Sequence, residues 1–439
     1  MAENITALKT AGEAKLAENF NASKSRLPGS PENRQGAFDN FASKGLPHKR
    51  VEEFKYTDVR AFLDEVAPLS IRPGDAEAKA ALEAARLFAA VDAFRITFVD
   101  GHFIHNLSDI AVLPKGIEIV SLAEAMAGNN QLLKQLGTLA KASDNPLYQL
   151  NSAFMGDGAI IRITKGTKLD KPLHLRFLSG TKPVATASRV LVLAEEDTNV
   201  TLLESHESRD GLAVQPNDVI EFKVANGSVV EHVRINAEGR DALAFSTLTA
   251  RLGANVSFAT TNAVFGAKVS RHQVYLAFEG DHSTAKVNGT ALLNGIQHAD
   301  STLVADHIAP NCDSRELFKT VIDDDAVGVF QGRINVNAEA QKTDGKMMSA
   351  CLLLSETGAM YNKPELEIFA DDVQCGHGAT CGALDEDLLF YLKARGLPHA
   401  EAESLLIQAF IGEAIEMVGH EEAREELISL TSHWLKKRG

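Results

Sequence analysis

The feature that most constrains the fold of this chain is a run of about two hundred residues, from Ala153 to Ser355, with strand patterns and no helix pattern. Segments such as "NDVIEFKVANGSVVEHVRINAEG" alternate apolar and polar residues with a period of two. Gly, Asn, Asp or Ser separates each short segment from the next. A run of evenly spaced strands without helices allows a β-sandwich, a β-barrel or a β-solenoid.

A parallel β-helix explains the details of this run. The charged residues Glu221 and Lys223 alternate with apolar neighbours, and Asn-Gly pairs recur between segments, at Asn226-Gly227 and Asn288-Gly289. Stacked coils repeat their corners and present a polar outer face, which is the observed pattern. No strict hexapeptide or nonapeptide repeat is present, so the pattern alone leaves the three architectures open.

The flanking segments differ from this core. Residues 1–152 predict a mainly helical region with short strands, two of them joined by a hairpin turn at Asp100-Gly101. After Gly382 the pattern changes to helix, with Asp385 as the first N-cap and Gly396 as the stop. We therefore divide the chain into an N-terminal region (1–152), a β core (153–383) and a C-terminal helical domain (384–439). That last domain is too small to be stable alone, so we expect it to dock on another surface.

Composition excludes several classes of partner. The net charge of −15 offers no basic face for nucleic acid or for an anionic membrane. No window approaches the roughly 18 apolar residues of a membrane span, and the N-terminus lacks the apolar stretch of a secretory signal. The four unevenly spread cysteines do not look like a disulfide framework. These features predict a cytoplasmic protein with free thiols.

The segment "DDVQCGHGATCG" holds the candidate chemistry. Cys375 and His377 are two positions apart, so on a strand both side chains point the same way. A thiolate and an imidazole suit iron, zinc or copper(I), but two ligands do not complete a tetrahedral site. The alternative is a small buried thiol beside a turn histidine. Gly376 and Gly378 fit either interpretation, as a backbone corner between strand and helix.

A catalytic Cys–His dyad is disfavoured at this position. Activation of a cysteine needs a lowered thiol pKa, and the adjacent carboxylates of Asp371 and Asp372 would raise it. We expect these two aspartates to form a turn rather than to bind a metal.

Longer motifs show a resemblance to a known family. The run from Phe330 to Glu416, which includes "KPELEIFADDVQCGHGATCGALDEDLLFYLKARGLP", resembles the SufB/SufD family of scaffold subunits in SUF iron–sulfur cluster assembly. "DHIAPNCDSRELFK" resembles a second family block. "GLPHKRVEEFKYTDV" resembles the N-terminal motif of the SufD branch, with Phe54 where Trp is usual. The resemblance extends over the whole chain and favours the SufD branch.

The resemblance implies a fold and a set of partners. It implies a right-handed parallel β-helix core, flanked by helical domains, that pairs with a SufB-type subunit. Cys375 and His377 would lie at that interface and hold a transient iron–sulfur cluster or iron, with further ligands from SufB and sulfide. The C-terminal helices would bind a SufC-type ABC ATPase, and the residues expected there are Asp385, Leu389, Tyr391, Arg395, Leu406 and Phe410. No catalytic turnover and no tightly held cofactor are expected of the isolated chain.

Two other functions stay open at this point. A β-helix carbohydrate lyase or hydrolase would need a basic or carboxylate-rich cleft on the solenoid face. An interaction module with a structural zinc would use Cys375, His377 and Cys381 as ligands. Neither the pattern nor the resemblance assigns a role to Cys312, Cys351 or Cys381.

Overall fold

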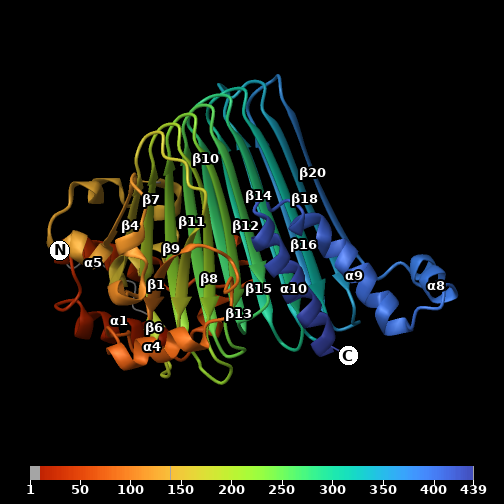
Figure 1. Cartoon of the computed structure of the whole chain (residues 1–439), viewed down its shortest axis with the longest axis horizontal. Coiled ribbons are helices and arrows are strands. Elements are labelled where there is room, and N and C mark those ends of the chain that lie inside the picture. Colours follow the sequence, from red (N-terminus) through yellow and green to blue (C-terminus); the bar gives the residue numbers. More distant parts are fainter. Residues whose placement is uncertain (1–9, 139, 439) are drawn as a thin grey trace.

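The computed structural model of the chain describes residues 10–138 and 140–438. Its centre is a parallel β-solenoid built from two long sheets that face each other (Figure 1). Each turn of the solenoid, here called a coil, contributes one strand to each sheet. From Val229 to Ser257, and on to Thr284, Asp313, Asp344 and Gln374, one coil takes 27 to 31 residues. A repeat this long explains why no hexapeptide or nonapeptide pattern is visible, and the predicted parallel β-helix architecture is confirmed.

Both sheets extend along the solenoid axis, and each gains one strand per coil. The first sheet contains, in spatial order after β1, the strands β5 (Leu173–Leu178), β8 (Asn199–Glu207), β10 (Val229–Ala237), β12 (Ser257–Val264), β14 (Thr284–Leu293), β16 (Asp313–Ile322), β18 (Asp344–Leu353) and β20 (Gln374–Gly382). The second contains β4 (Asp157–Ile163), β7 (Ser188–Ala194), β9 (Gln215–Val224), β11 (Leu243–Leu252), β13 (Val269–Phe278), β15 (His298–His307), β17 (Val327–Val336) and β19 (Ala359–Ile368).

The period-2 alternation of the sequence sorts side chains between the solenoid interior and its outer faces. Inward residues at equivalent positions, such as Ile220, Leu248, Val274 and Leu303, stack along the axis into one continuous apolar cluster. The predicted Asn-Gly corner is confirmed at Gly227, whose φ of 73° requires glycine or a similarly tolerant residue. The second predicted corner is wrong, because Asn288 and Gly289 lie inside β14. Repetition of the same inward and outward pattern in each coil is what allows the solenoid to grow.

The interior also contains a buried polar cluster. Glu204 of β8 accepts hydrogen bonds from His206 at 2.5 Å, from His232 at 3.0 Å and from Arg234 at 2.9 Å. Burial alone would raise the pKa of Glu204, but the bonds from the two histidines hold that pKa well below its ordinary value. The carboxylate therefore joins two neighbouring coils through charged groups that are paired rather than isolated.

The N-terminal region closes one end of the solenoid. The strands β1 (Phe94–Val99), β2 (His102–Phe103) and β3 (Ile117–Ser121) extend the two sheets, and β2 and β3 pair antiparallel with their neighbours. The hairpin predicted at Asp100-Gly101 joins β1 to β2, and both residues have positive φ. The helices here are α1 (Ala11–Ser23), α2 (Pro31–Lys44), α3 (Val59–Phe62), α4 (Asp75–Ala84), α5 (Leu122–Ala127), α6 (Ala140–Ser143) and α7 (Pro146–Phe154).

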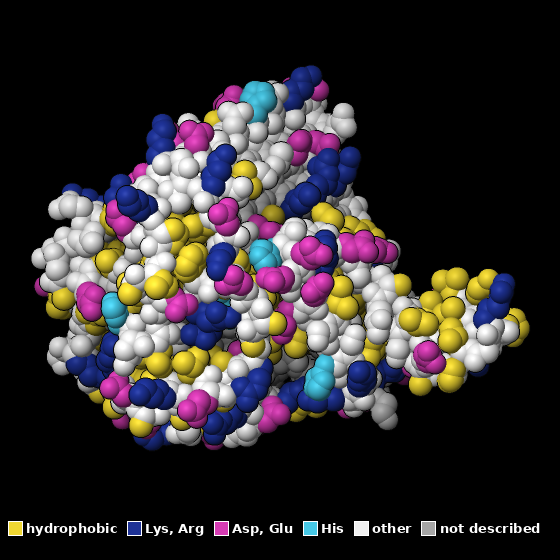
Figure 2. Space-filling view, viewed as in Figure 1, with side chains coloured by type: hydrophobic (Ala, Val, Ile, Leu, Met, Phe, Trp, Pro, Cys, Tyr) yellow, Lys and Arg dark blue, Asp and Glu magenta, His cyan; other side chains and the backbone are white. Residues whose placement is uncertain are grey.

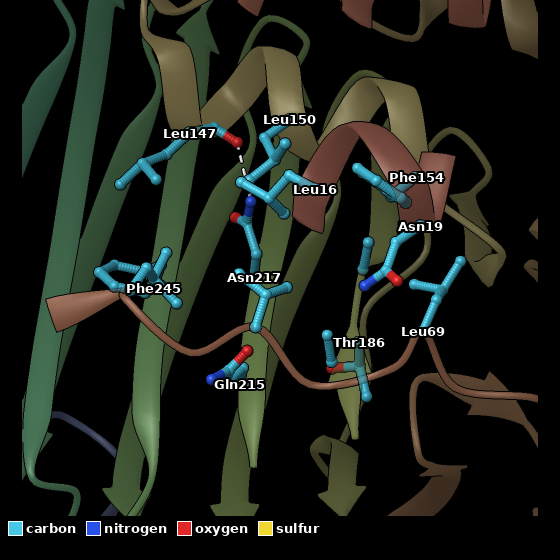
Figure 3. Close-up of a pocket in the computed structure, with 14 residues that line it drawn as sticks. Leu16, Asn19, Leu69, Leu147, Leu150, Phe154, Thr186, Gln215, Asn217 and Phe245 are labelled. Atoms are coloured by element: carbon cyan, nitrogen blue, oxygen red, sulfur yellow. Dashed lines mark hydrogen bonds between the residues drawn. The ribbon is translucent and has the colours of Figure 1, made fainter. Parts of the chain in front are cut away.

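Helices α1 and α7 pack on the outer face of the second sheet. Figure 3 shows the contact, where Asn217 of β9 donates to the backbone oxygen of Leu147 at 2.8 Å. A small cavity of about 50 Å³ remains there, lined mainly by apolar side chains such as Leu16, Leu150 and Phe245. We interpret this cavity as a packing gap between the helices and the sheet.

The C-terminal domain consists of three helices, α8 (Glu386–Ala394), α9 (His399–Ile415) and α10 (Glu421–Arg438). The predicted N-cap is confirmed, since the Asp385 side chain accepts from the Leu388 amide at 2.9 Å. Helices α9 and α10 lie on the outer face of the first sheet, whereas α8 projects away from the body of the molecule (Figure 1). Within the described residues, no helix combines the length and the apolar character that a membrane crossing requires.

The C-terminal domain was expected to dock on another surface, and in the structure that surface is the outer face of the solenoid. Ile407, Ile411 and Ile415 of α9 form one buried cluster with outward residues of the first sheet. We call this the docking cluster; its sheet residues are Leu203, Val233, Ile235, Ala263, Leu292, Val321 and Leu352. Lys319 of β16 adds polar contacts, because its Nζ lies 2.7 Å from Glu413 and 4.4 Å from the Phe410 ring centroid.

Candidate functional site

The two ends of the solenoid differ. At the N-terminal end, antiparallel strands and helices cover the first coil. At the other end, β19 and β20 are the terminal strands of their sheets, and in the described part of the chain no further strand pairs with them. Their outer edges present unpaired backbone groups, which is the usual template for adding another chain. We call this the open end.

Strand β20 carries both Cys375 and His377 at the open end. Cys375 is paired in register with Gly345 of β18, and His377 with Met347. Met347 belongs to the interior cluster and Cys375 packs against that cluster, so both positions face the solenoid interior. The prediction that the two side chains share one face of a strand is confirmed.

The surrounding residues correct one detail. Gly376 and Gly378 were expected at a corner between strand and helix, but they lie within β20, and α8 begins only at Glu386. A Cβ at Gly378 would come within 2.9 Å of the Met348 sulfur, so the Met348 side chain would have to shift to admit a larger residue. The actual turn precedes β20 and contains Asp371 and Asp372, as predicted. The Asp372 carboxylate forms an ion pair with Lys342.

The chemical state of the pair follows from its surroundings. Cys375 is half-buried and His377 is exposed. Burial raises the pKa of the Cys375 thiol, and the carboxylates of Asp344 and Glu316 raise it further. The hydrogen bond with the Gly345 backbone lowers this pKa, but it does not cancel the increase. The responsible acids are thus Asp344 and Glu316 rather than the two aspartates of the turn. A thiol with a raised pKa is a poor nucleophile, which disfavours a catalytic dyad. A metal ion could bind Cys375 only by displacing its proton.

The structure does not bring together the zinc ligand set of Cys375, His377 and Cys381. Cys381 lies six residues beyond Cys375 on the same continuous strand, which places the two about 20 Å apart. The described residues contain no group of three or more His, Cys, Asp or Glu side chains suited to a metal ion. The structural-zinc alternative is therefore wrong in its ligand set, and Cys375 and His377 form an incomplete pair.

The other cysteines lie at distinct positions. Cys312 is fully buried and its sulfur donates to the backbone oxygens of Gly280 and Pro310, each at 3.4 Å, which is a structural role. Cys351 of β18 is buried and lies directly opposite Cys381. This last proximity could not be read from the sequence, because it depends on the register between two coils.

Exposed apolar side chains mark two surfaces, of which sequence reasoning missed the first and named only part of the second. In the turn after β19, Phe369 is 67% exposed and lies at the open end beside Ile368. On α8, Phe390 is 74% exposed, with Leu388 and Tyr391 also exposed. Figure 2 shows hydrophobic side chains gathered on the projecting α8. The sequence signal for the second surface was present, since "DLLFYL" is apolar around the whole helix and therefore has no single buried face.

The residues expected to bind the ATPase divide into two groups. Leu389, Tyr391 and the N-cap Asp385 belong to the projecting α8 or its start, and Arg395 follows it, donating to the Tyr391 hydroxyl at 3.0 Å. Leu406 and Phe410 lie on α9 and are half-buried. Phe410 packs beside the docking cluster and under Lys319, so it also holds α9 on the solenoid.

Fold and site together define a class of protein: a two-sheet parallel β-solenoid with one closed end and one open end that presents a thiol and an imidazole. Comparison with known families agrees with this description. The family model described as "SUF system FeS cluster assembly, SufBD core domain" matches residues 177–410, and "SufBD protein N-terminal region" matches residues 21–175. The chain belongs to the SufBD family, which confirms the resemblance found in its motifs.

Individual relatives match over most of their length. An iron–sulfur cluster assembly SufBD family protein of Synechocystis is 33% identical over 403 residues, which cover 88% of this chain and 86% of the relative. The iron–sulfur cluster assembly protein SufD of Escherichia coli is 27% identical over 394 residues, with 88% of each chain covered. SufD of Bacillus subtilis is 24% identical over 332 residues, covering 73% of this chain and 75% of the relative. None of these names supports the carbohydrate-active alternative.

Proposed function

We propose that this chain is a SufD-type scaffold subunit that pairs through its open end with a SufB-type subunit. A nascent iron–sulfur cluster would be held between the two subunits on Cys375 and His377. The observation that carries the proposal is that both side chains face the interior of the last coil, where no further coil of the described residues covers them. Thiolate and imidazole are established ligands of iron–sulfur clusters.

Two further features support pairing at this end. Two ligands cannot satisfy a four-coordinate iron, so a cluster here needs a partner's ligands and sulfide. The unpaired edges of β19 and β20, with the exposed Phe369 and Ile368 nearby, offer backbone hydrogen bonds and apolar area to such a partner. A cluster assembled between two subunits can be released when the interface rearranges.

The projecting helix α8 is the proposed contact for a SufC-type ABC ATPase. Leu388, Phe390 and Tyr391 are exposed there, and a patch of this kind marks an interaction site. We propose that the chain itself has no catalytic turnover and that the cluster is cargo rather than a resident cofactor. A cytoplasmic location stays a prediction.

The cluster site can be tested by co-expression with SufB-type and SufC-type partners without oxygen. Cys375→Ala and His377→Ala are each expected to reduce iron and sulfide per purified complex severalfold, while all three subunits still co-purify. Cys381→Ala is the matched control, because it removes an exposed thiol from the same strand and should leave cluster loading unchanged. Normal loading in both Cys375→Ala and His377→Ala would refute the assignment.

The ATPase contact needs point variants rather than a deletion. Removing residues 384–439 would expose the docking cluster, including Val233 and Ile235, and would destabilise the solenoid. Phe390→Ser changes a side chain that is 74% exposed, so it should abolish co-purification of the ATPase and leave the SufB-type subunit bound. Retention of both partners would place the ATPase contact elsewhere.

A further inference from the structure

Two cysteines outside the proposed cluster site lie next to each other. Cys351 of β18 and Cys381 of β20 occupy directly paired positions of a parallel ladder. Paired residues of neighbouring parallel strands point to the same face, about 4.8 Å apart. The two thiols therefore lie one above the other on the last two coils. His377 is four residues away along the strand, about 13 Å, so this pair is a separate feature.

The two thiols differ in access to solvent. Cys351 is 3% exposed and packs with Ala291 and Ile322, whereas Cys381 is exposed. Burial raises the pKa of Cys351, and the charge and hydrogen bond of Cys381 raise it further. The thiolate is the reactive form of a cysteine. A reagent from solution therefore reacts first with the exposed Cys381, and the buried Cys351 is the second thiol of the pair.

We propose that Cys351 and Cys381 are a modification site, a thiol pair that peroxides convert into a disulfide across the last two coils. With hydrogen peroxide, the Cys381 thiolate attacks one oxygen and becomes a sulfenic acid, and hydroxide leaves. The Cys351 sulfur then attacks the Cys381 sulfur; the new S–S bond forms as the S–O bond breaks. The hydroxyl leaves as water with the Cys351 proton. Two thiols and one peroxide thus give one disulfide and two waters.

The geometry permits a disulfide between Cys351 and Cys381, and this bond would strengthen the attachment of β20. Cα atoms joined by a disulfide are usually 4.4–6.8 Å apart, and parallel neighbours fall within that range. Among the residues that the structure describes, strand β20 is paired on one side only, and Gly382, next to Cys381, has open space around it. The end of the strand therefore has room to approach β18. The disulfide would reinforce the β18–β20 ladder, which pairs β20 with the solenoid. Strand β20 carries the proposed cluster ligands.

The test uses the full chain, reduced and then treated with a small excess of hydrogen peroxide. The free-thiol count is expected to fall from four to two, and digestion without reductant should release one linked peptide containing Cys351 and Cys381. Dithiothreitol should restore all thiols. Hydrogen exchange of the β20 amides should be slower in the oxidised chain than in the reduced chain.

Variants separate this pair from the other cysteines. Cys351→Ala and Cys381→Ala should each abolish the linked peptide, and Cys351→Ala should leave Cys381 as a sulfenic acid that dimedone traps. Cys375→Ala, the control, should still lose two thiols. Cys381 is exposed, so Cys381→Ala should fold normally. It therefore tests the proposal even if truncation of the buried Cys351 prevents folding. Linkage of Cys381 to Cys375, linkage only between separate chains, or an unchanged thiol count would overturn the proposal.

Discussion

Replacing Ile411 by alanine is expected to release the C-terminal helices from the solenoid before the solenoid itself unfolds. Ile411 is fully buried in the docking cluster between α9 and the first sheet. Trp434 of α10, the single tryptophan of the chain, lies in the same cluster and is 6% exposed. Its fluorescence therefore reports whether the helices are docked, because undocking would expose the indole to water.

The magnitude follows from the groups removed. Ile411→Ala deletes three buried carbon groups, worth about 2.5 kcal/mol of transfer free energy at roughly 0.8 kcal/mol each. The cavity left behind adds to this cost, which stays within the 2–5 kcal/mol range of such substitutions. The better helix propensity of alanine offsets about 0.4 kcal/mol. A net cost of about 2 kcal/mol or more raises the undocked population by about 30-fold or more, since 1.4 kcal/mol is a factor of ten.

The assay is urea titration, followed by Trp434 emission and by far-ultraviolet circular dichroism of the strands. In Ile411→Ala the red shift of Trp434 should move to lower urea and precede the loss of strand signal. Ile428→Ala is the matched control on α10, because Ile428 is 49% exposed and its truncation should change stability by less than about 0.5 kcal/mol. An unchanged Trp434 transition in Ile411→Ala would refute the docking described here.

Three further predictions concern charge and exposure. Alkylation of Cys375 by iodoacetamide, followed by peptide mass spectrometry, should rise at higher pH than for an ordinary thiol because burial raises its pKa, with a contribution from Asp344; Asp344→Asn should move the rise to lower pH, and an identical profile would contradict this cause. Burial, aided by the charge of Asp218, raises the pKa of Glu238 to about 8. The stability that its protonated form contributes is therefore complete below the unfolded-state pKa of about 4.3 and is lost as pH rises through about 8. Glu238→Gln should flatten this decline in urea midpoints, and an equally steep decline would exclude Glu238 as its source. Phe390→Ser should leave the urea midpoint within about 0.5 kcal/mol of wild type because the ring is 74% exposed, and a larger loss would mean that α8 packs on the body.

The sequence predicted those features that depend on local pattern. Alternation over residues 153–383 indicated stacked strands, and Asp385 marked the start of α8 through its side-chain cap. The shared face of Cys375 and His377 followed from strand geometry alone, because two residues are one repeat of an extended chain. These features need no knowledge of which distant segments meet.

Features that depend on coil register could not be predicted. Cys351 and Cys381 are partners only because one coil happens to take 30 residues at this point. The paired charges around Glu204 escaped detection for the same reason: alternation shows that a residue points to one face, but not that this face is the interior. The acids near Cys375 were also misassigned, since Asp344 and Glu316 come from neighbouring coils while Asp371 and Asp372 are close only in sequence.

The difference between the two ends of the solenoid links the fold to the proposed chemistry. A stack of coils needs a cap at each end, because an uncovered coil leaves its strand edges and its interior face open. This chain supplies strands and helices for one end, whereas at the other end β20 leaves Cys375 half-buried and His377 exposed. The raised pKa of Cys375 keeps the thiol protonated at neutral pH, so a positive ion must displace its proton before it can act as a ligand. A partner that covers the open end and brings iron and sulfide would satisfy the strand edges and the ligand pair in the same event, which is why we place assembly and pairing at one surface.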